Sequence, residues 1–340
     1  MTGTAHPLHP PEGGGMTALV RAEGLSKWFP SRGLFRHGRA VQAVTDVDLS
    51  IGQHEAVGLV GESGSGKSTI GRLLLGLIPP SAGSVVLDGV DLVEANAATL
   101  RRLRRRMQIV FQDPYSSLDP RRRVGPQIAD GLAIHHLLPA RQRRERVEEL
   151  LAQVGLQPEH ADRYPHEFSG GQRQRIGIAR ALATGPDFVV ADEPVSALDV
   201  SVQAQVLAVL ADLRTRLGLA LLFISHDLPV VRSLCDRVVV LYLGRIMEEG
   251  PAARVLERPS HPYTRALLSA TPSLDPMRRR TRILLSGDPP SPSDPPSGCV
   301  FRTRCPYAIP ACAEGVPPLD EIETGHRAAC IRKHELPPAP

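Results

Sequence analysis

The chain has 340 residues, of which 42% are apolar and 22% charged, and its formal net charge is +4. This composition is typical of a soluble globular protein, and the small net charge does not favour a nucleic-acid binder, which usually has a strongly basic face. No apolar run approaches the roughly 18 residues that cross a bilayer, and residues 1–15 lack the apolar segment of a signal peptide, so we expect a cytoplasmic protein.

Recognisable patterning begins just after Met16. We therefore predict a flexible tail over residues 1–16, and either Met1 or Met16 can be the true start. Short apolar or alternating runs predict the next strands, separated by a loop at Ser31–Arg39: Ala18–Arg21, Val47–Ile51 and Ala56–Val60. A helix is expected over 67–77, and a strand and turn over 84–94.

Residues 97–168 are rich in Arg, Leu and Glu, with helical periodicity around Arg141–Val154, and are predicted to form a mostly helical insertion. Beyond it, helices are expected at Gln172–Leu182, 200–217 and 228–234, and strands at Phe188–Ala191, 219–225 and 237–242. The apolar run Phe188–Ala191 lacks polar alternation, as expected of a central parallel strand covered on both faces. Alternating strands and helices predict an α/β domain with a largely parallel sheet.

The composition changes after about residue 257. Segment 286–298 is rich in proline and is not expected to form regular structure, and a cysteine-bearing tail follows over 299–334. We predict a main domain over 17–257, with the helical subdomain at about 97–168, and a C-terminal extension over 258–340.

A glycine-rich run lies between a predicted strand and a predicted helix. Residues 61–68 (GESGSGKS) fit the phosphate-loop pattern G-x-x-x-x-G-K-[ST] in the strand–helix context that the pattern requires. Glycines let backbone N–H groups surround phosphates, and a helix N-terminus favours an anion. We expect Lys67 to reach the β and γ phosphates and Ser68 to ligate Mg²⁺. The candidate ATP-binding residues here are Gly61, Ser63, Gly64, Gly66, Lys67, Ser68 and Thr69.

Two acidic residues end the buried run at 188–191. Asp192 can hold Mg²⁺ at the strand end, and Glu193 can polarise an attacking water. On its own this would be an acidic turn, but the phosphate loop makes a catalytic pair the better interpretation.

Phosphate loops also occur in kinases, GTPases and helicases, so a further motif has to select the family. Residues 168–172 (FSGGQ), before a predicted helix, resemble the signature motif of ABC ATPases, with Phe168 in place of the usual Leu. Ser169, Gly170, Gly171 and Gln172, with the helix N-terminus, can hold the γ-phosphate of a partner's nucleotide. The fold implied is a P-loop NTPase of the ABC type.

The resemblance assigns further residues in the family's order. Gln112 matches the Q-loop glutamine that senses Mg²⁺, Asp199 the D-loop aspartate at the dimer interface, and His226 the switch histidine at the γ-phosphate. Phe29 matches the aromatic that stacks on adenine, with Trp28 as the rival. The catalytic set implied is Lys67, Glu193 and His226, with Mg²⁺ held through Ser68, Gln112 and Asp192.

Longer stretches resemble the ATPase subunits of oligopeptide/dipeptide importers, and in particular their F-type member. These are residues 110–120, 192–205, 261–264 and 298–306. The resemblance implies ATP and Mg²⁺ as cofactors, a paralogous or identical ATPase partner, two membrane permeases, a substrate-binding protein acting indirectly, and a place on the cytoplasmic face of the inner membrane. Nickel import, a non-transport ABC ATPase and a non-catalytic regulator remain alternatives, and the transported solute is not encoded in these motifs.

Four of the five cysteines lie in the last 42 residues, at Cys299, Cys305, Cys312 and Cys330. Their spacing is not that of a zinc ribbon or finger. Members of the resembled family can hold a [4Fe–4S] cluster in such a tail; zinc, with His326 nearby, and reduced apolar thiols are the alternatives. Cys235 is expected in the core. The basic runs Arg101–Arg106 and Arg278–Arg280 are best interpreted as solvated faces.

Overall fold

The computed structural model describes residues 18–30, 39–113, 115, 117–271 and 283–336. The predicted tail at 1–16, both candidate start methionines, most of the Ser31–Arg39 loop and the run Arg278–Arg280 lie outside the described residues.

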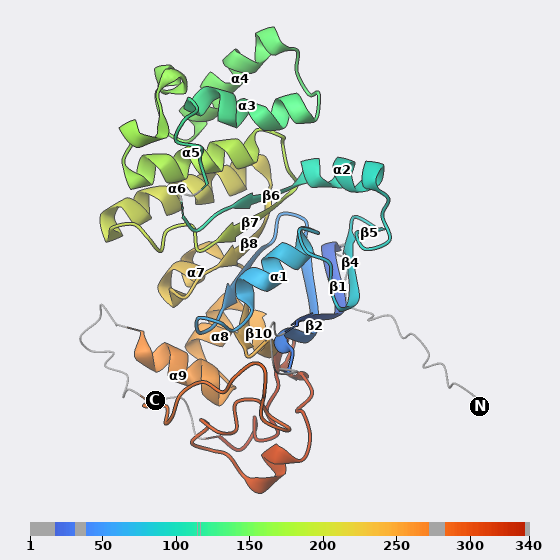
Figure 1. Cartoon of the computed structure of the whole chain (residues 1–340). Helices are drawn as coiled ribbons and strands as arrows, with labels where there is room; N and C mark the ends of the chain where they lie inside the picture. The colour runs from blue at the N-terminus through green and yellow to red at the C-terminus, as the bar shows by residue number, and fades with distance from the viewer. Residues whose placement is uncertain (1–17, 31–38, 114, 116, 272–282, 337–340) are drawn as a thin grey trace, which may run out of the picture.

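Two sheets carry the described part of the chain (Figure 1). The strands are β1 Ala18–Phe29, β2 Val41–Gly52, β3 Ala56–Val60, β4 Ala82–Leu87, β5 Val90–Asp91, β6 Met107–Val110, β7 Phe188–Asp192, β8 Ala220–Ile224, β9 Arg237–Tyr242, β10 Arg245–Pro251, β11 Asp320–Glu323 and β12 His326–Ala328. The helices are α1 Lys67–Leu74, α2 Ala97–Arg106, α3 Val124–Ile134, α4 Ala140–Gln153, α5 Gly170–Leu182, α6 Val200–Leu217, α7 Leu228–Leu234, α8 Ala252–Glu257 and α9 Pro262–Ala270. Short 3₁₀ turns occur at Pro158–Asp162, Pro165–Glu167 and Pro310–Ala313.

The larger sheet has the order β11-β12-β10-β9-β3-β8-β7-β6, and its strands from β9 to β6 run parallel. Every residue of β3, β7 and β8 is buried, as expected where helices or a second sheet cover both faces. The predicted α/β fold with a largely parallel sheet is confirmed. The smaller, antiparallel sheet has the order β2-β1-β4-β5.

Most predicted elements of the main domain are present, with shifted ends. The helix expected over 67–77 ends at Leu74, and β1 continues to Phe29 rather than stopping at Arg21. Segment 286–298 has no helix or strand, as predicted. Within the region predicted to be mostly helical, Met107–Val110 instead forms β6, paired in parallel with β7. Strands β10, β11 and β12 were not predicted either.

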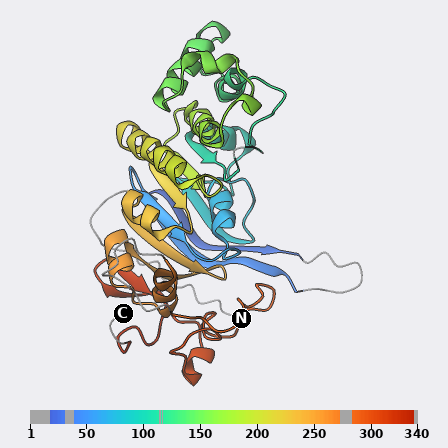
Figure 2. The ribbon, with the colours of Figure 1, turned by 90° about the vertical axis from the view of Figure 1, so that its left-hand side faces the viewer.

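The helices α3, α4 and α5 gather at one end of the molecule, and the C-terminal extension lies at the other (Figures 1 and 2). Two apolar cores lie on opposite faces of β3: Val57 and Leu59 belong to the core shared with the antiparallel sheet, while Ala56 and Val60 belong to the core under the helices. That second core includes Phe301 from the extension. The extension therefore packs as part of the main core and adds β12 and β11 to the edge of its sheet.

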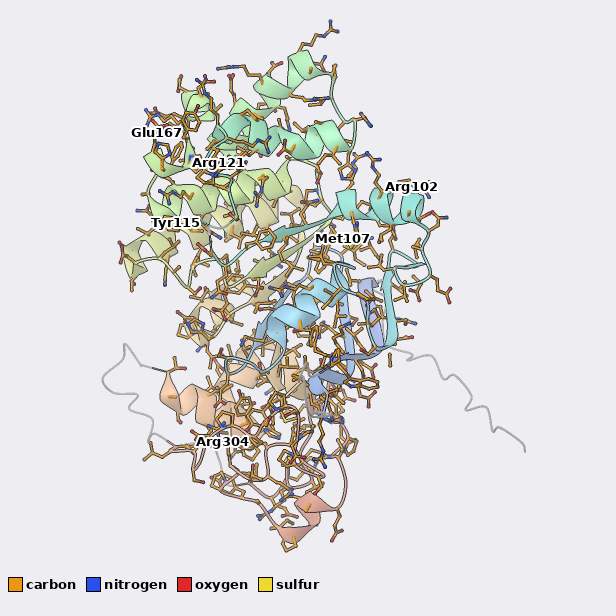
Figure 3. The ribbon with its side chains drawn as sticks, viewed as in Figure 1. Arg102, Met107, Tyr115, Arg121, Glu167 and Arg304 are labelled. Atoms are coloured by element: carbon orange, nitrogen blue, oxygen red, sulfur yellow. The ribbon has the colours of Figure 1, made fainter. Side chains whose placement is uncertain are left out.

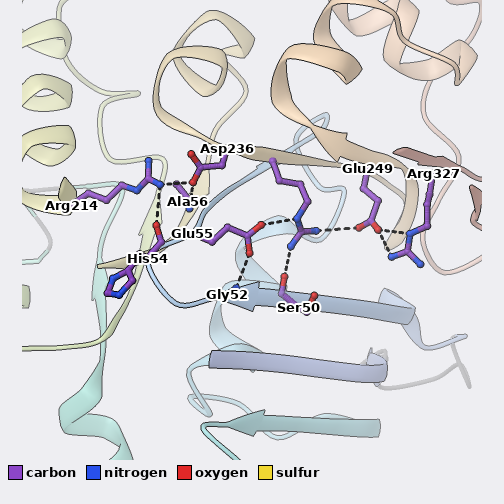
Figure 4. Close-up of polar contacts among 10 residues, drawn as sticks. Ser50, Gly52, His54, Glu55, Ala56, Arg214, Asp236, Glu249 and Arg327 are labelled. Atoms are coloured by element: carbon purple, nitrogen blue, oxygen red, sulfur yellow. Dashed lines mark hydrogen bonds and ion pairs between the residues drawn. The ribbon is translucent and has the colours of Figure 1, made fainter. Parts of the chain in front are cut away.

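Charged side chains join this sheet edge to its neighbours (Figure 4). Arg237 on β9 donates to Glu55 at 2.8 Å and contacts Glu249 on β10 at 3.5 Å. Arg327 on β12 donates through Nε to the same Glu249 at 2.7 Å. Because Glu249 is nearly inaccessible, the two guanidinium groups offset the cost of burying its carboxylate.

In the described part of the chain, no helix combines the length and the apolar character needed to span a membrane.

Candidate nucleotide-binding site

The phosphate loop turns out of β3 and into α1, and two of its glycines are fixed by close backbone contacts. Gly66 has a φ of 105°, and a Cβ there would lie 2.2 Å from the carbonyl oxygen of Ala43. A Cβ on Gly61 would lie 2.2 Å from the carbonyl oxygen of Leu241. Only glycine lets this loop lie so close to β2 and to the end of β9.

Lys67, the first residue of α1, is buried beside the phosphate loop. Its Nζ donates to the carbonyl oxygens of Gly61, at 2.8 Å, and Glu62, at 2.9 Å. Burial lowers the pKa of its ammonium group, and the charges of Glu193, Asp192 and Glu62 act in the opposite direction. These carbonyls satisfy the ammonium until a stronger acceptor, such as a phosphate oxygen, replaces them.

Ser68 and Asp192 meet at the carboxyl end of β7. Ser68 Oγ donates to Asp192 Oδ1 at 2.8 Å. Burial raises the pKa of the Asp192 carboxyl, while the Ser68 hydrogen bond lowers it. A hydroxyl and a carboxylate oxygen at one point are ligands that Mg²⁺ prefers, so this pair fits the ion.

Glu193 is held between two polar side chains. Gln112 Nε2 donates to Glu193 Oε2 at 3.2 Å, and His226 Nδ1 lies 3.5 Å from the same oxygen. Glu193 has a φ of 46°, a left-handed conformation that costs a non-glycine residue about 1 kcal/mol. This strained backbone conformation turns Glu193 away from Asp192 and toward the cavity.

One cavity of about 600 Å³ joins these groups, a volume within the range of small-molecule sites. Ten predicted residues line it: Gly61, Ser63, Gly64, Gly66, Lys67, Ser68, Thr69, Gln112, Glu193 and His226. Asp192 is not among the described lining residues but accepts a hydrogen bond from Ser68, which is.

Sequence reasoning missed the other lining residues, which are Val41, Ala43, Val60, Glu62, Leu228, Leu267 and Pro292. Leu267 and Pro292 belong to the C-terminal extension. Pro292 also accepts a backbone hydrogen bond from Gln42 at 2.9 Å. No motif indicates Leu267 and Pro292, because the fold brings them to the cavity from a distant part of the chain.

The signature residues lie apart from this cavity. Ser169 caps α5, where its Oγ accepts from the Gln172 N–H at 3.3 Å and Gln172 Oε1 accepts from the Ser169 N–H at 3.0 Å. A Cβ on Gly171 would lie 2.2 Å from Val202 on α6, so this glycine allows the two helices to pack closely. Ser169 and Asp199 are exposed. Both residues are therefore accessible at the surface of the chain.

The predicted adenine-stacking residues end β1. Phe29 is 39% exposed, with Lys27 Nζ 5.3 Å from its ring centroid, and Trp28 is 45% exposed. Neither is among the described residues that line the cavity.

The four clustered cysteines border one small cavity of about 20 Å³ inside the extension, beside Phe301 and His261. Burial raises the pKa of Cys299, Cys330 and Cys305, the last to about 11. His326 lies elsewhere, with Nε2 2.8 Å from Glu248. Within the described ranges, no three His, Cys, Asp or Glu side chains are arranged to hold a single metal ion. Cys235 lies in the core, as predicted.

Two known families match the sequence. Residues 44–196 match the ABC transporter family, and residues 247–312 match the C-terminal region of oligopeptide/dipeptide transporters.

Similarity to known proteins extends over most of the chain. The chain is 57% identical over 316 residues to a putative peptide import ATP-binding protein of Brucella ovis, covering 93% of this chain and 98% of the relative. It is 49% identical to the dipeptide transport ATP-binding protein DppF of Haemophilus influenzae, covering 93% and 97%. Among solved structures, a dimeric ATP-binding cassette in a post-hydrolysis state with ADP and Pi superposes with a TM-score of 0.62 at 29% identity, covering 68% of this chain and 98% of that one.

Proposed function

Because the chain belongs to the oligopeptide/dipeptide family of ABC transporter ATP-binding proteins, we propose that it binds and hydrolyses ATP in the cavity at α1 to drive peptide import. One observation carries the proposal. Lys67, the Ser68–Asp192 pair and the Gln112–Glu193–His226 group surround a single cavity of nucleotide size.

The phosphates of ATP would displace the carbonyls of Gly61 and Glu62 from Lys67, and the loop N–H groups at the start of α1 would face them. Ser68 and Asp192, with Gln112 close by, would hold Mg²⁺. The ion supplies positive charge to the phosphate oxygens when it is bound.

Glu193 would orient the attacking water and accept its proton, because its carboxylate borders the cavity. Gln112 and His226 hold that carboxylate, and His226 is exposed enough to turn toward a γ-phosphate. Phe29 remains our candidate for stacking on adenine, which would require the base to extend past the described lining.

The second half of the site would come from a second ATPase subunit, either identical or paralogous. The tip of α5 in that subunit, with Ser169, Gly170, Gly171 and Gln172, would cover the γ-phosphate, and Asp199 would lie across the interface. A related cassette of known structure is dimeric.

The transporter would also contain two membrane permeases, with a substrate-binding protein acting from outside, and this chain would lie on the cytoplasmic face of the inner membrane. The extension favours peptides, since residues 247–312 match the region found in oligopeptide/dipeptide transporters. We place the ATPase domain at 17–257, with its helical part at about 97–168, and the extension at 258–340.

Nickel import is the alternative cargo. We expect the complete transporter in vesicles to take up a radiolabelled dipeptide. Unlabelled peptides should compete with this uptake, and Ni²⁺ should not. Competition by Ni²⁺ alone would replace the peptide assignment.

We also propose that Cys299, Cys305, Cys312 and Cys330 hold a [4Fe–4S] cluster. Four thiols border one cavity and are the ligands that such a cluster takes, although four thiols can also hold zinc without His326, which is paired with Glu248. The cavity of about 20 Å³ would have to widen to admit the cluster. A bound cluster would cross-link four points of the extension. We expect the anaerobically purified protein to contain iron and sulfide, and the Cys305→Ser variant to lose both. Zinc in place of iron, or no metal, would contradict the cluster.

The hydrolytic role is tested with Glu193→Gln. We expect ATP binding to be kept and hydrolysis by the assembled transporter to fall by at least about 100-fold, since a positioned general base contributes about 10²–10⁴-fold. The matched control is Glu257→Gln, which removes a surface glutamate paired with Arg232. Full turnover in Glu193→Gln would reject the role, and failure of the parent chain to hydrolyse ATP with its membrane partners would favour a non-catalytic regulator.

A further inference from the structure

The C-terminal extension reaches into the nucleotide site through one residue of the phosphate loop. Glu62 is contacted at its backbone N–H, its carbonyl and its side chain. Its N–H donates to Tyr263 Oη at 2.8 Å, its carbonyl oxygen accepts from Lys67 at 2.9 Å, and its carboxylate accepts from Arg304 Nη1 at 2.8 Å. Two of these three partners, Tyr263 and Arg304, belong to the extension.

Arg304 is poorly placed to serve stability alone. Its side chain is 10% exposed, and no described residue accepts a hydrogen bond from its buried Nε. Burying a guanidinium with an unpaired N–H costs free energy, and one ion pair to a half-buried carboxylate offsets only part of that cost. The ion pair of Arg304 is with Glu62 of the phosphate loop, and its other side-chain hydrogen bond is to Tyr242, so a role in that loop accounts for its position. Figure 3 labels Arg304 in the extension.

Tyr263 belongs to a packed aromatic cluster, and Arg304 contacts the same cluster. Phe301 is fully buried, with ring centroids 5.2 Å from Tyr263 and 5.3 Å from Tyr242. The Arg304 N–H donates to the Phe301 carbonyl at 3.0 Å, and Arg304 Nη1 lies 3.4 Å from Tyr242 Oη. Large buried rings have few alternative rotamers in a dense core, so the cluster holds Tyr263 Oη and Arg304 at fixed points.

From these contacts we infer that Arg304 and Tyr263 are positioning residues for ATP binding, which act by fixing the Glu62 peptide of the phosphate loop. The inference rests on the proposed ATP site. Because its N–H is bonded to Tyr263 and its carbonyl to Lys67, the Glu62 peptide sets how the following loop residues face the cavity. A loop released from these contacts populates other conformations, and the apparent affinity falls with the fraction that remains competent.

The test is a double-mutant cycle on the full chain, with Mg-ATP affinity measured by calorimetry and unfolding followed in parallel. We expect Arg304→Gln to weaken ATP binding by about 10-fold, the scale of one charged hydrogen bond. Glu62→Gln should have a similar effect from the other side of the contact, and the double variant should be no weaker than either single one.

The matched control is Arg327→Gln, which breaks another ion pair between an extension arginine and a glutamate of the main sheet, Glu249, away from the loop (Figure 4). It should lower the unfolding temperature without changing ATP affinity.

Unchanged ATP affinity in Arg304→Gln, an equal loss in Arg327→Gln, or additive losses in the double variant would each overturn the inference. If Arg304→Gln does not fold, Glu62→Gln tests the same contact with the extension unaltered, and normal ATP affinity there would also overturn it. A parent chain that binds no ATP would reject the proposed site itself, whereas a parent that binds ATP normally beside an unaffected Arg304→Gln rejects only the positioning role.

Discussion

The nucleotide cavity has two walls that are built differently. The wall at α1 comes from neighbouring residues in sequence, with Gly61, Lys67 and Ser68 on one turn after β3. The second wall includes Leu267 and Pro292, which lie some 200 residues further along the chain, and Tyr263 and Arg304 of the same extension contact Glu62 of the phosphate loop. The first wall carries the groups that bind phosphates, while the second fixes their backbone. Phosphate binding thus depends on particular residue types at short spacing, whereas support needs only that the fold bring suitable groups together.

The sharpest test of the first wall is Lys67→Ala. Because Lys67 is the buried cation of the loop, we expect the ATPase rate of the assembled transporter to fall by about 100-fold or more. The control is Lys333→Ala, which removes a lysine paired with Asp320 in the extension and should leave the rate within about twofold. Equal losses in the two variants would mean that the loss of activity is not specific to the lysine of the phosphate loop.

A smaller loss is expected from Gly66→Ala, where the new Cβ would meet the Ala43 carbonyl and the φ of 105° is strained. ATP affinity should fall by about 10-fold or more. Gly64→Ala is the matched control, because φ is also positive there, at 77°, but a Cβ would meet nothing within 4 Å. If Gly64→Ala weakened binding as much as Gly66→Ala, backbone proximity would not explain the glycine.

For the second wall, Tyr263→Phe removes the acceptor of the Glu62 N–H at a buried position. We expect a loss of about 2 kcal/mol in the free energy of unfolding, the cost of a buried unpaired donor, measured by denaturant titration. Tyr307→Phe, at a partly exposed position, is the control and should change stability by less than about 0.5 kcal/mol. A neutral Tyr263→Phe would show that water or another group satisfies the N–H.

The smallest effect is expected from Arg254→Ala, which breaks the ion pair between α8 and Glu323 on β11. Both side chains are about half exposed, so the free energy of unfolding should drop by less than about 1 kcal/mol. A larger loss would mean that the extension is held to the main domain by its surface charges rather than by its buried cluster.

The same contrast explains what the sequence could predict. The strands β3, β7 and β8 are continuous apolar runs, and the phosphate loop is one contiguous motif, so both could be recognised directly. Strand β6 was missed because four residues after an arginine-rich helix carry too little pattern to stand out. The contact between Glu62 and Arg304 joins residues 242 positions apart, and no spacing rule reaches that far.

For Phe29, the sequence indicated a candidate residue but not the contacts that it makes. An aromatic at the end of β1 could be placed by its resemblance, but neither it nor Trp28 lines the described cavity. Which ring meets a base depends on how a nucleotide lies in the cavity, and a pattern of residue types does not contain that information.

The most direct measurement concerns the pairing of two subunits around ATP. Glu193→Gln, given Mg-ATP and either a second copy or the paralogous ATPase subunit, should form a dimer with two trapped nucleotides, seen by light scattering and nucleotide analysis. Adding Ser169→Arg to every subunit should leave each cavity able to bind ATP but abolish the dimer. A dimer that persists despite Ser169→Arg, or one that never forms with either mate, would contradict the account.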